Sequence, residues 1–139
     1  MKSLIVYSSA SANIKQLAQA LYDHLSGEKK LCTFSEAPNP TGYNFVAVGF
    51  WLQDDVPDPE TQAFLAQLEE SQDTYLFATH EAESESPLAV RGMKVARDIA
   101  KKAHIIQTFS CSAEVADKAM VDAQDVKRVV RMLEGMDLP

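Results

Sequence analysis

The chain has 139 residues, of which 46% are hydrophobic and 24% are charged, and its formal net charge is −7. This length predicts a single domain, residues 1–139, with one core. The negative charge argues against a nucleic-acid partner, because acidic side chains repel phosphates. No apolar run is long enough for a transmembrane helix, so we expect a cytoplasmic protein that does not enter a membrane. The two cysteines, Cys32 and Cys111, lack the spacing of a metal or redox motif and are expected to be reduced thiols.

The first third of the chain predicts a strand, a helix and a second strand. Lys2 to Tyr7 is typical of a buried strand, and Leu31 to Phe34 is a shorter one. Between them, apolar residues recur at helical spacing: Ile14, Leu17, Ala18, Leu21 and Leu25. The loop that leads into this helix, YSSASAN, consists largely of small residues.

The middle of the chain repeats the alternation. Phe45 to Phe50 is apolar throughout, as a central parallel strand covered on both faces should be. The segment WLQDDVPD that follows is predicted to be a polar loop. Asp58 and Pro59 are the N-cap and first-turn signals of a helix, PETQAFLAQLEE.

The last part of the chain predicts two more strands and two more helices. Thr74 to Thr79 is the next strand, Ser86 with Pro87 repeats the helix-start signal, and His104 to Ser110 is the last strand. A final amphipathic helix is marked by Val126, Val129, Val130 and Leu133. Five strands that alternate with four helices predict an α/β fold, a doubly wound parallel sheet with helices on both faces.

In such sheets ligands bind beyond the carboxyl ends of the strands, where three loops converge: YSSASAN, FWLQDD and ATHEAESES. The first loop enters a helix N-terminus, whose unpaired N–H groups suit a phosphate. Ser8, Ser9 and Ser11 add hydroxyl donors, although these residues and Asn13 are also favoured helix caps. The loop has no Gly-x-Gly-x-x-Gly and no Lys of the nucleoside-triphosphate type, which argues against a dinucleotide or ATP.

The other two loops carry an aromatic residue and several acids. Trp51 is the only tryptophan, and it either stacks on a flat ligand or closes the core. The third loop places Glu81, Glu83 and Glu85 beside His80, and a solvated acidic loop is the simpler interpretation of that pattern. The acids of the second loop lack a His or Cys that would complete a ligand set, so no metal is expected.

Nearly the whole chain resembles the flavodoxin family, in particular its short members that begin Tyr-Ser-Ser-x-Thr-Gly-Asn-Thr-Lys. The resemblance is carried by YSSASANIKQLAQAL, VAVGFWLQDDVPDPETQAFL and YLFATHEAESESPLAVRGM, and FSCS is similar to the Phe-x-Cys-Gln-Gly of some members. It implies a flavodoxin-like sheet with strand order 2-1-3-4-5 and bound FMN. The FMN phosphate would lie in the first loop and the isoalloxazine ring between the second and third loops, with Trp51 as the stacking aromatic.

The cofactor-binding residues that this resemblance implies come from all three loops. They are Ser8, Ser9, Ala10, Ser11, Ala12, Asn13, Ile14, Phe50, Trp51, Leu52, Gln53, Asp54, Asp55, Thr79, His80, Glu81, Ala82 and Ser86.

The resulting hypothesis is an FMN-dependent electron carrier between a reductase and an acceptor, in which no side chain acts as acid, base or nucleophile. We expect a monomer whose redox partners dock through a basic face. The chain departs from the family motif at Ala12, Ile14 and Asp55, where relatives carry Gly, Thr and often Gly. These departures keep a second function open, a flavodoxin-fold accessory or binding subunit with weak or lost FMN binding.

Overall fold

The computed structural model describes residues 2–8, 12–53, 56–69, 72–80 and 87–112, together with Arg131. In chain order the elements are β1 (Lys2–Tyr7), α1 (Ala12–His24), β2 (Glu28–Thr33), the 3-10 turns η1 (Phe34–Glu36) and η2 (Pro40–Gly42), β3 (Phe45–Gln53), β4 (Val56–Pro57), α2 (Pro59–Leu65), β5 (Asp73–His80), α3 (Pro87–Ile99) and β6 (His104–Ser112). The final helix predicted around residues 126–133 lies, apart from Arg131, outside these ranges.

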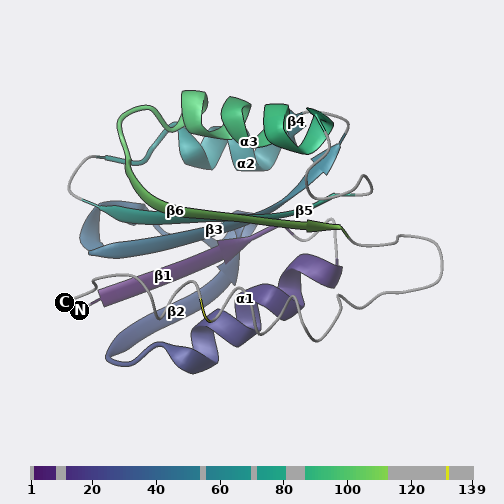
Figure 1. Cartoon of the computed structure of the whole chain (residues 1–139). Helices are drawn as coiled ribbons and strands as arrows, with labels where there is room; N and C mark the ends of the chain where they lie inside the picture. Colours follow the sequence, from purple (N-terminus) through teal and green to yellow (C-terminus); the bar gives the residue numbers. More distant parts are fainter. Residues whose placement is uncertain are drawn as a thin grey trace.

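The strands form one sheet in the order β2-β1-β3-β5-β6, and every pair along this path is parallel. The short β4 pairs with β3 in the antiparallel direction, off this path. Figure 1 shows α1 on one side of the sheet and α2 and α3 on the other. The predicted doubly wound fold and its strand order are therefore confirmed, with β5 and β6 as the fourth and fifth parallel strands.

The sheet separates two apolar clusters, because successive side chains of a strand point to opposite faces. The α1 cluster joins the stripe predicted for that helix to alternate residues of the central strands: Ile5, Ile14, Leu17, Ala18, Leu21, Leu25, Phe45, Ala47, Tyr75, Phe77 and Phe109. The α2/α3 cluster takes the intervening residues, among them Val46, Val48, Phe50, Leu52, Leu76 and Ala78. Both faces of β3 and β5 are buried, which explains why these strands read as continuous apolar runs.

The largest difference from the sequence prediction is the segment after Phe50. We predicted a polar loop, but β3 continues through Gln53, and Leu52 and Gln53 pair with β4. The reason is a tertiary contact between this segment and α3. Leu52 is 2% exposed and packs on α3, where a Cβ added to Gly92 would lie 2.8 Å from its methyl carbons. Burial of an apolar side chain on the neighbouring helix keeps this segment extended.

Two other element boundaries differ from the prediction by three residues or more. The second strand begins at Glu28, three residues before Leu31, because its charged start pairs with β1 at the edge of the sheet. Helix α2 ends at Leu65, although helical spacing predicted a longer helix. After Leu65 the backbone forms a turn that is tighter than an α-helix, in which the Leu68 N–H donates to the Leu65 carbonyl at 3.2 Å. This turn buries Leu68, which is 1% exposed.

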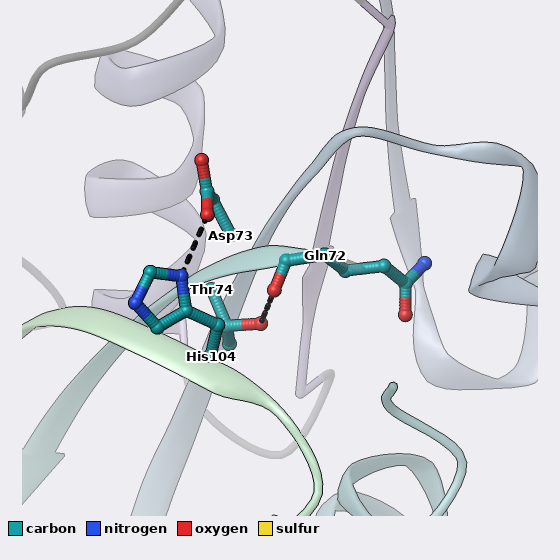
Figure 2. A network of polar contacts seen from close by, with 4 residues as sticks. All are labelled: Gln72, Asp73, Thr74 and His104. Carbon is teal, nitrogen blue, oxygen red and sulfur yellow. Dashed lines mark hydrogen bonds and ion pairs between the residues drawn. The ribbon is translucent and has the colours of Figure 1, made fainter. Parts of the chain in front are cut away.

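Polar side chains tie the amino ends of the strands together. Asp73 at the start of β5 accepts from the His104 ring at the start of β6, with 2.9 Å between Oδ1 and Nδ1, and Figure 2 shows this pair spanning the two strands. The Gln72 side chain donates to the carbonyls of Pro40 and Tyr43. These contacts occupy the edge opposite to the predicted ligand site, so His104 has a structural role there.

Candidate functional site

The carboxyl ends of β1, β3 and β5 lie next to one another in the middle of the sheet. Tyr7 is the register partner of Gly49, and Gly49 is the partner of Phe77. From β1 the chain crosses to β2, which lies on one side of β1, and it then crosses back to β3, which lies on the other side of β1. The direction of winding therefore changes between β1 and β3. Ligands of doubly wound sheets bind at such a switch point. The fold thus brings together the strand ends from which all three predicted loops leave.

Helix α1 starts directly above this switch point. Its first residues are Ala12 and Asn13, and its first turn contains no acidic residue. Ile14 is fully buried in the α1 cluster, so its side chain holds the helix against the sheet. An N-terminus without a carboxylate keeps its positive dipole end uncompensated and suits an anion. The predicted phosphate-loop residues Ser9, Ala10 and Ser11 lie outside the described residues.

Ser8, which was predicted to contact the cofactor, follows directly after β1. It is fully buried, and its N–H donates to the Gly49 carbonyl at 2.9 Å. Its hydroxyl donates to Asp58 Oδ2 at 3.2 Å, on the α2/α3 side of the sheet. This contact directs the Ser8 proton away from α1. The described contacts therefore make Ser8 an anchor of the loop start.

Asp58 links that anchor to α2. It occupies the N-cap position that the sequence predicted, but its side chain accepts no backbone N–H of the helix. Instead its two oxygens accept from Ser8 and from the Thr61 hydroxyl, the latter at 2.5 Å, and the residue is only 9% exposed. The sequence signal for the contact with Thr61 was its position three residues after Asp58, the predicted N-cap of α2. Nothing in the sequence indicated the contact with Ser8, which lies fifty positions earlier.

The side chains at the end of β3 lie alternately on the two faces of the sheet. Phe50 and Leu52 are buried in the α2/α3 cluster, where their side chains pack against apolar neighbours. Trp51 is half-buried and lies on the α1 face, level with Thr79 of β5. The backbone of Gln53 ends the strand, and Asp54 and Asp55 lie outside the described residues. Trp51 is therefore the aromatic side chain of this segment that lies on the same face as α1.

The end of β5 completes the described part of the site. Thr79 is fully buried and His80 is 2% exposed. The Thr79 hydroxyl has no hydrogen-bond partner among the residues that the structure describes. Glu81, Ala82 and Ser86, which were predicted to contact the cofactor, lie outside the described ranges, as do Glu83 and Glu85.

These features fit a flat, anionic ligand such as FMN. The acid-free start of α1 suits the phosphate, the half-buried Trp51 offers a ring face, and Thr79 offers a hydroxyl that the described residues leave unused. Within the same residues we find no group of three or more His, Cys, Asp or Glu that could hold a metal ion, and no helix that could cross a membrane.

Cys32 lies near the carboxyl end of β2, the outer strand next to β1, where its register partner is Val6. It is 6% exposed and packs in the α2/α3 cluster from β2. Burial raises the pKa of the Cys32 thiol above its ordinary value, an effect that the charge of Lys30 partly opposes. Because the thiolate is the reactive form, the raised pKa argues against a role for Cys32 as a nucleophile.

Comparisons with known proteins agree with the fold. The family model described as "Flavodoxin domain" matches residues 4–130. The flavodoxin-like domain-containing protein BilS of Clostridioides difficile (strain CD3) is 26% identical over 122 residues, which cover 84% of this chain and 69% of BilS. A flavodoxin of Streptococcus pneumoniae aligns with a TM-score of 0.75 at 12% identity, and 96% of each chain is covered. A flavoprotein in complex with FMN from Lactobacillus acidophilus has a TM-score of 0.64 at 13% identity, with 78% of this chain and 92% of that chain covered.

Proposed function

The chain is a member of the flavodoxin domain family, and from this premise we propose that it binds FMN and carries electrons between a reductase and an acceptor. The observation that carries the proposal is the start of α1 at the switch point of the sheet, with no acid in its first turn. When bound, FMN supplies the redox chemistry. The solved flavoprotein with a similar fold that was crystallised with FMN adds support from outside this chain.

The residues of this chain would hold the cofactor by its two ends. The N–H groups that open α1 would bind the phosphate, together with the hydroxyls of Ser9 and Ser11. The buried contact between Ser8 and Asp58 would fix the start of that loop relative to α2. Trp51 would flank the ring on the α1 face. In this proposal no side chain acts as acid, base or nucleophile, so the protein contributes binding, orientation and electrostatics.

The proposal extends to the partners. The acids predicted to surround the ring, in the loops after β3 and β5, would attract a redox partner with a basic face. Reduction by such a partner should slow as ionic strength rises, because salt screens the attraction. A reduction rate that does not depend on salt would contradict this docking mode.

The deciding experiment is a visible absorption spectrum of the freshly purified protein. We expect flavin bands at about one equivalent per chain, and the flavin released by denaturation should be FMN rather than riboflavin or a dinucleotide. Colourless protein should be titrated with FMN before a conclusion is drawn. If it cannot be reconstituted, the carrier proposal is wrong, and the accessory or binding subunit becomes the better interpretation.

A further inference from the structure

Helix α3 and the turn that follows it carry positive charge on a chain that is otherwise strongly acidic. Residues 87–104 contain one acid, Asp98, and five cations, Arg91, Lys94, Arg97, Lys101 and Lys102. With histidine neutral, this segment has a net charge of +4, and the rest of the chain has −11, the difference between −7 and +4. Because salt screens charges beyond about 8 Å, a partner at α3 is attracted by the local positive charge.

The exposed side chains of α3 form one stripe along the helix. Val90, Lys94 and Arg97 are exposed and follow one another at spacings of four and three residues, which places them on one side of a helix. Lys101 continues this spacing in the turn after the helix and is also exposed. The other side of α3, which includes Met93, is buried in the α2/α3 cluster and covers the sheet (Figure 1). The stripe therefore faces away from the core.

Helix stability does not explain the charge of this stripe. Lys94 Nζ pairs with Asp98 Oδ2 at 3.1 Å, but the two side chains are 75% and 66% exposed, and such surface pairs contribute little. Their order, with the cation on the N-terminal side, is also the less favourable one in a helix. Arg97 has a structural contact, since it donates to the Thr108 hydroxyl of β6 at 3.0 Å. The remaining cations need another explanation.

The carboxyl-terminal end of the stripe borders a hollow of about 480 Å³. This hollow is lined by Glu69, Lys101, Lys102, Ala103 and His104. Lys101 and Lys102 form no ion pair within the part of the chain that the structure describes. The hollow therefore offers two ammonium groups to carboxylates from outside the chain.

The start of α3 adds an apolar part to the same surface. Val90 is 61% exposed and Val56 of β4 is 41% exposed, and they are the exposed large hydrophobic residues within the described ranges. Because α3 packs against β4, the two valines lie on the same side of the molecule. Exposed apolar side chains beside a row of charges are typical of a surface that binds another protein.

From these features we infer that α3 is a docking surface for an acidic protein partner. Carboxylates of the partner bind Lys94, Lys101 and Lys102, and its apolar side chains cover Val90 and Val56. The 13 residues of α3 span only about 20 Å, so a nucleic-acid duplex or an anionic membrane would extend beyond the stripe and meet the acidic rest of the chain. The inference goes beyond the proposed function, in which acidic loops attract a partner with a basic face, because it adds a docking surface of opposite charge.

The probe for this surface is a short synthetic peptide in which glutamates alternate with leucines. Titration of isotope-labelled protein, followed by NMR, should shift the backbone signals of the α3 stripe, and the affinity should fall as salt is added. A matched peptide with glutamine in place of glutamate should bind more weakly and lose this salt dependence. Signals that shift only on other surfaces would contradict the inference.

Two double variants with the same change in charge locate the attraction. Lys94→Gln with Lys101→Gln should weaken peptide binding by about two- to thirtyfold, the range expected for two exposed charge pairs. Lys2→Gln with Lys30→Gln changes exposed lysines of β1 and β2 and should leave the affinity unchanged. Since all four side chains are exposed, the melting temperatures should stay near that of the wild type. Equal loss in both double variants would mean that net charge alone governs binding, and the inference would be wrong.

The apolar part of the surface has its own test. Val90→Ser should weaken binding of the peptide by about three- to tenfold, because less apolar area is buried against its leucines. The same substitution should leave unchanged the binding of a peptide in which serine replaces each leucine. An equal effect on both peptides would contradict the contact with Val90.

Other occupants give different results. Tighter binding to phosphatidylserine-containing vesicles or to a DNA duplex than to the peptide, lost in Lys94→Gln with Lys101→Gln, would overturn the inference. So would a wild-type dimer in analytical ultracentrifugation that the same double variant dissociates, since the occupant would then be a second copy of the chain. None of these measurements needs bound flavin, so the absorption spectrum decides the proposed function separately.

Discussion

The two faces of the sheet differ most at its carboxyl edge. On the α2/α3 face the polar groups form hydrogen bonds with one another, since Asp58 accepts from two buried hydroxyls. The apolar side chain of Leu52 on this face packs against α3. On the α1 face the helix begins without an acid, Trp51 is half-buried and Thr79 has no described hydrogen-bond partner. The α2/α3 face therefore supports the candidate site by close packing, while the α1 face has polar and aromatic groups that the described chain leaves unused.

The largest effect is expected from Leu52, whose side chain is buried on the α2/α3 face. Leu52→Ala should lower the free energy of unfolding by about 2 to 5 kcal/mol, because it removes buried methyl groups from the α2/α3 cluster. Chemical denaturation of the apoprotein measures the loss. Val56→Ala, at the 41% exposed position on β4, is the control and should change stability little. Equal effects of the two substitutions would mean that this face is not closed by packing.

Asp58 tests the polar part of the same face. Asp58→Ala should cost about 1.5 to 3 kcal/mol of stability, because the buried Thr61 hydroxyl would lose the carboxylate that accepts its hydrogen bond and the contact with Ser8 would be lost as well. It should also weaken FMN binding through the position of Ser8, although Asp58 itself touches no ligand in our proposal. Glu60→Ala removes an exposed acid from the first turn of the same helix and serves as the matched control. A Glu60 variant as unstable as the Asp58 variant would argue against the buried network.

On the α1 face the expected effects are on binding. Replacing both Ser9 and Ser11 with Ala should weaken FMN binding by about 1 to 3 kcal/mol, if each hydroxyl supplies a hydrogen bond to the charged phosphate. Fluorescence titration of the apoprotein with FMN measures this change, and the melting temperature of the apoprotein should stay near that of the wild type. Unchanged affinity would count against the phosphate assignment for this loop.

The stacking contribution of Trp51 should be the smallest of these effects, and Trp51 should give the clearest spectroscopic signal. Trp51→Ala should weaken FMN binding by about 0.5 to 1.5 kcal/mol beyond the effect of lost buried area, the amount typical of an aromatic pair. In the wild-type protein its fluorescence should be quenched by bound flavin and recover when the flavin is removed, and it is the only tryptophan that contributes. Fluorescence that does not respond to flavin would place Trp51 away from the ring.

The sequence by itself determined the order of the elements and much of what each one buries. The stripe from Ile14 to Leu25 predicted the buried face of α1, and Pro59 and Pro87 predicted where α2 and α3 begin. The apolar run from Phe45 predicted a central strand covered on both faces. These features follow from residues within a few positions of one another, because helical and strand periodicity are local properties.

Tertiary structure decided the details of the candidate site. The extension of β3 to Gln53 required α3 beside Leu52, and the direction of the Ser8 hydroxyl required Asp58 to lie next to it across the sheet. Whether the Thr79 hydroxyl has a hydrogen-bond partner depends on the side chains that the neighbouring strands place around it. Each of these outcomes is set by contacts between distant segments, and such contacts exist only once the sheet has formed. Local pattern therefore located the candidate site, and long-range packing decided the environments of its described side chains.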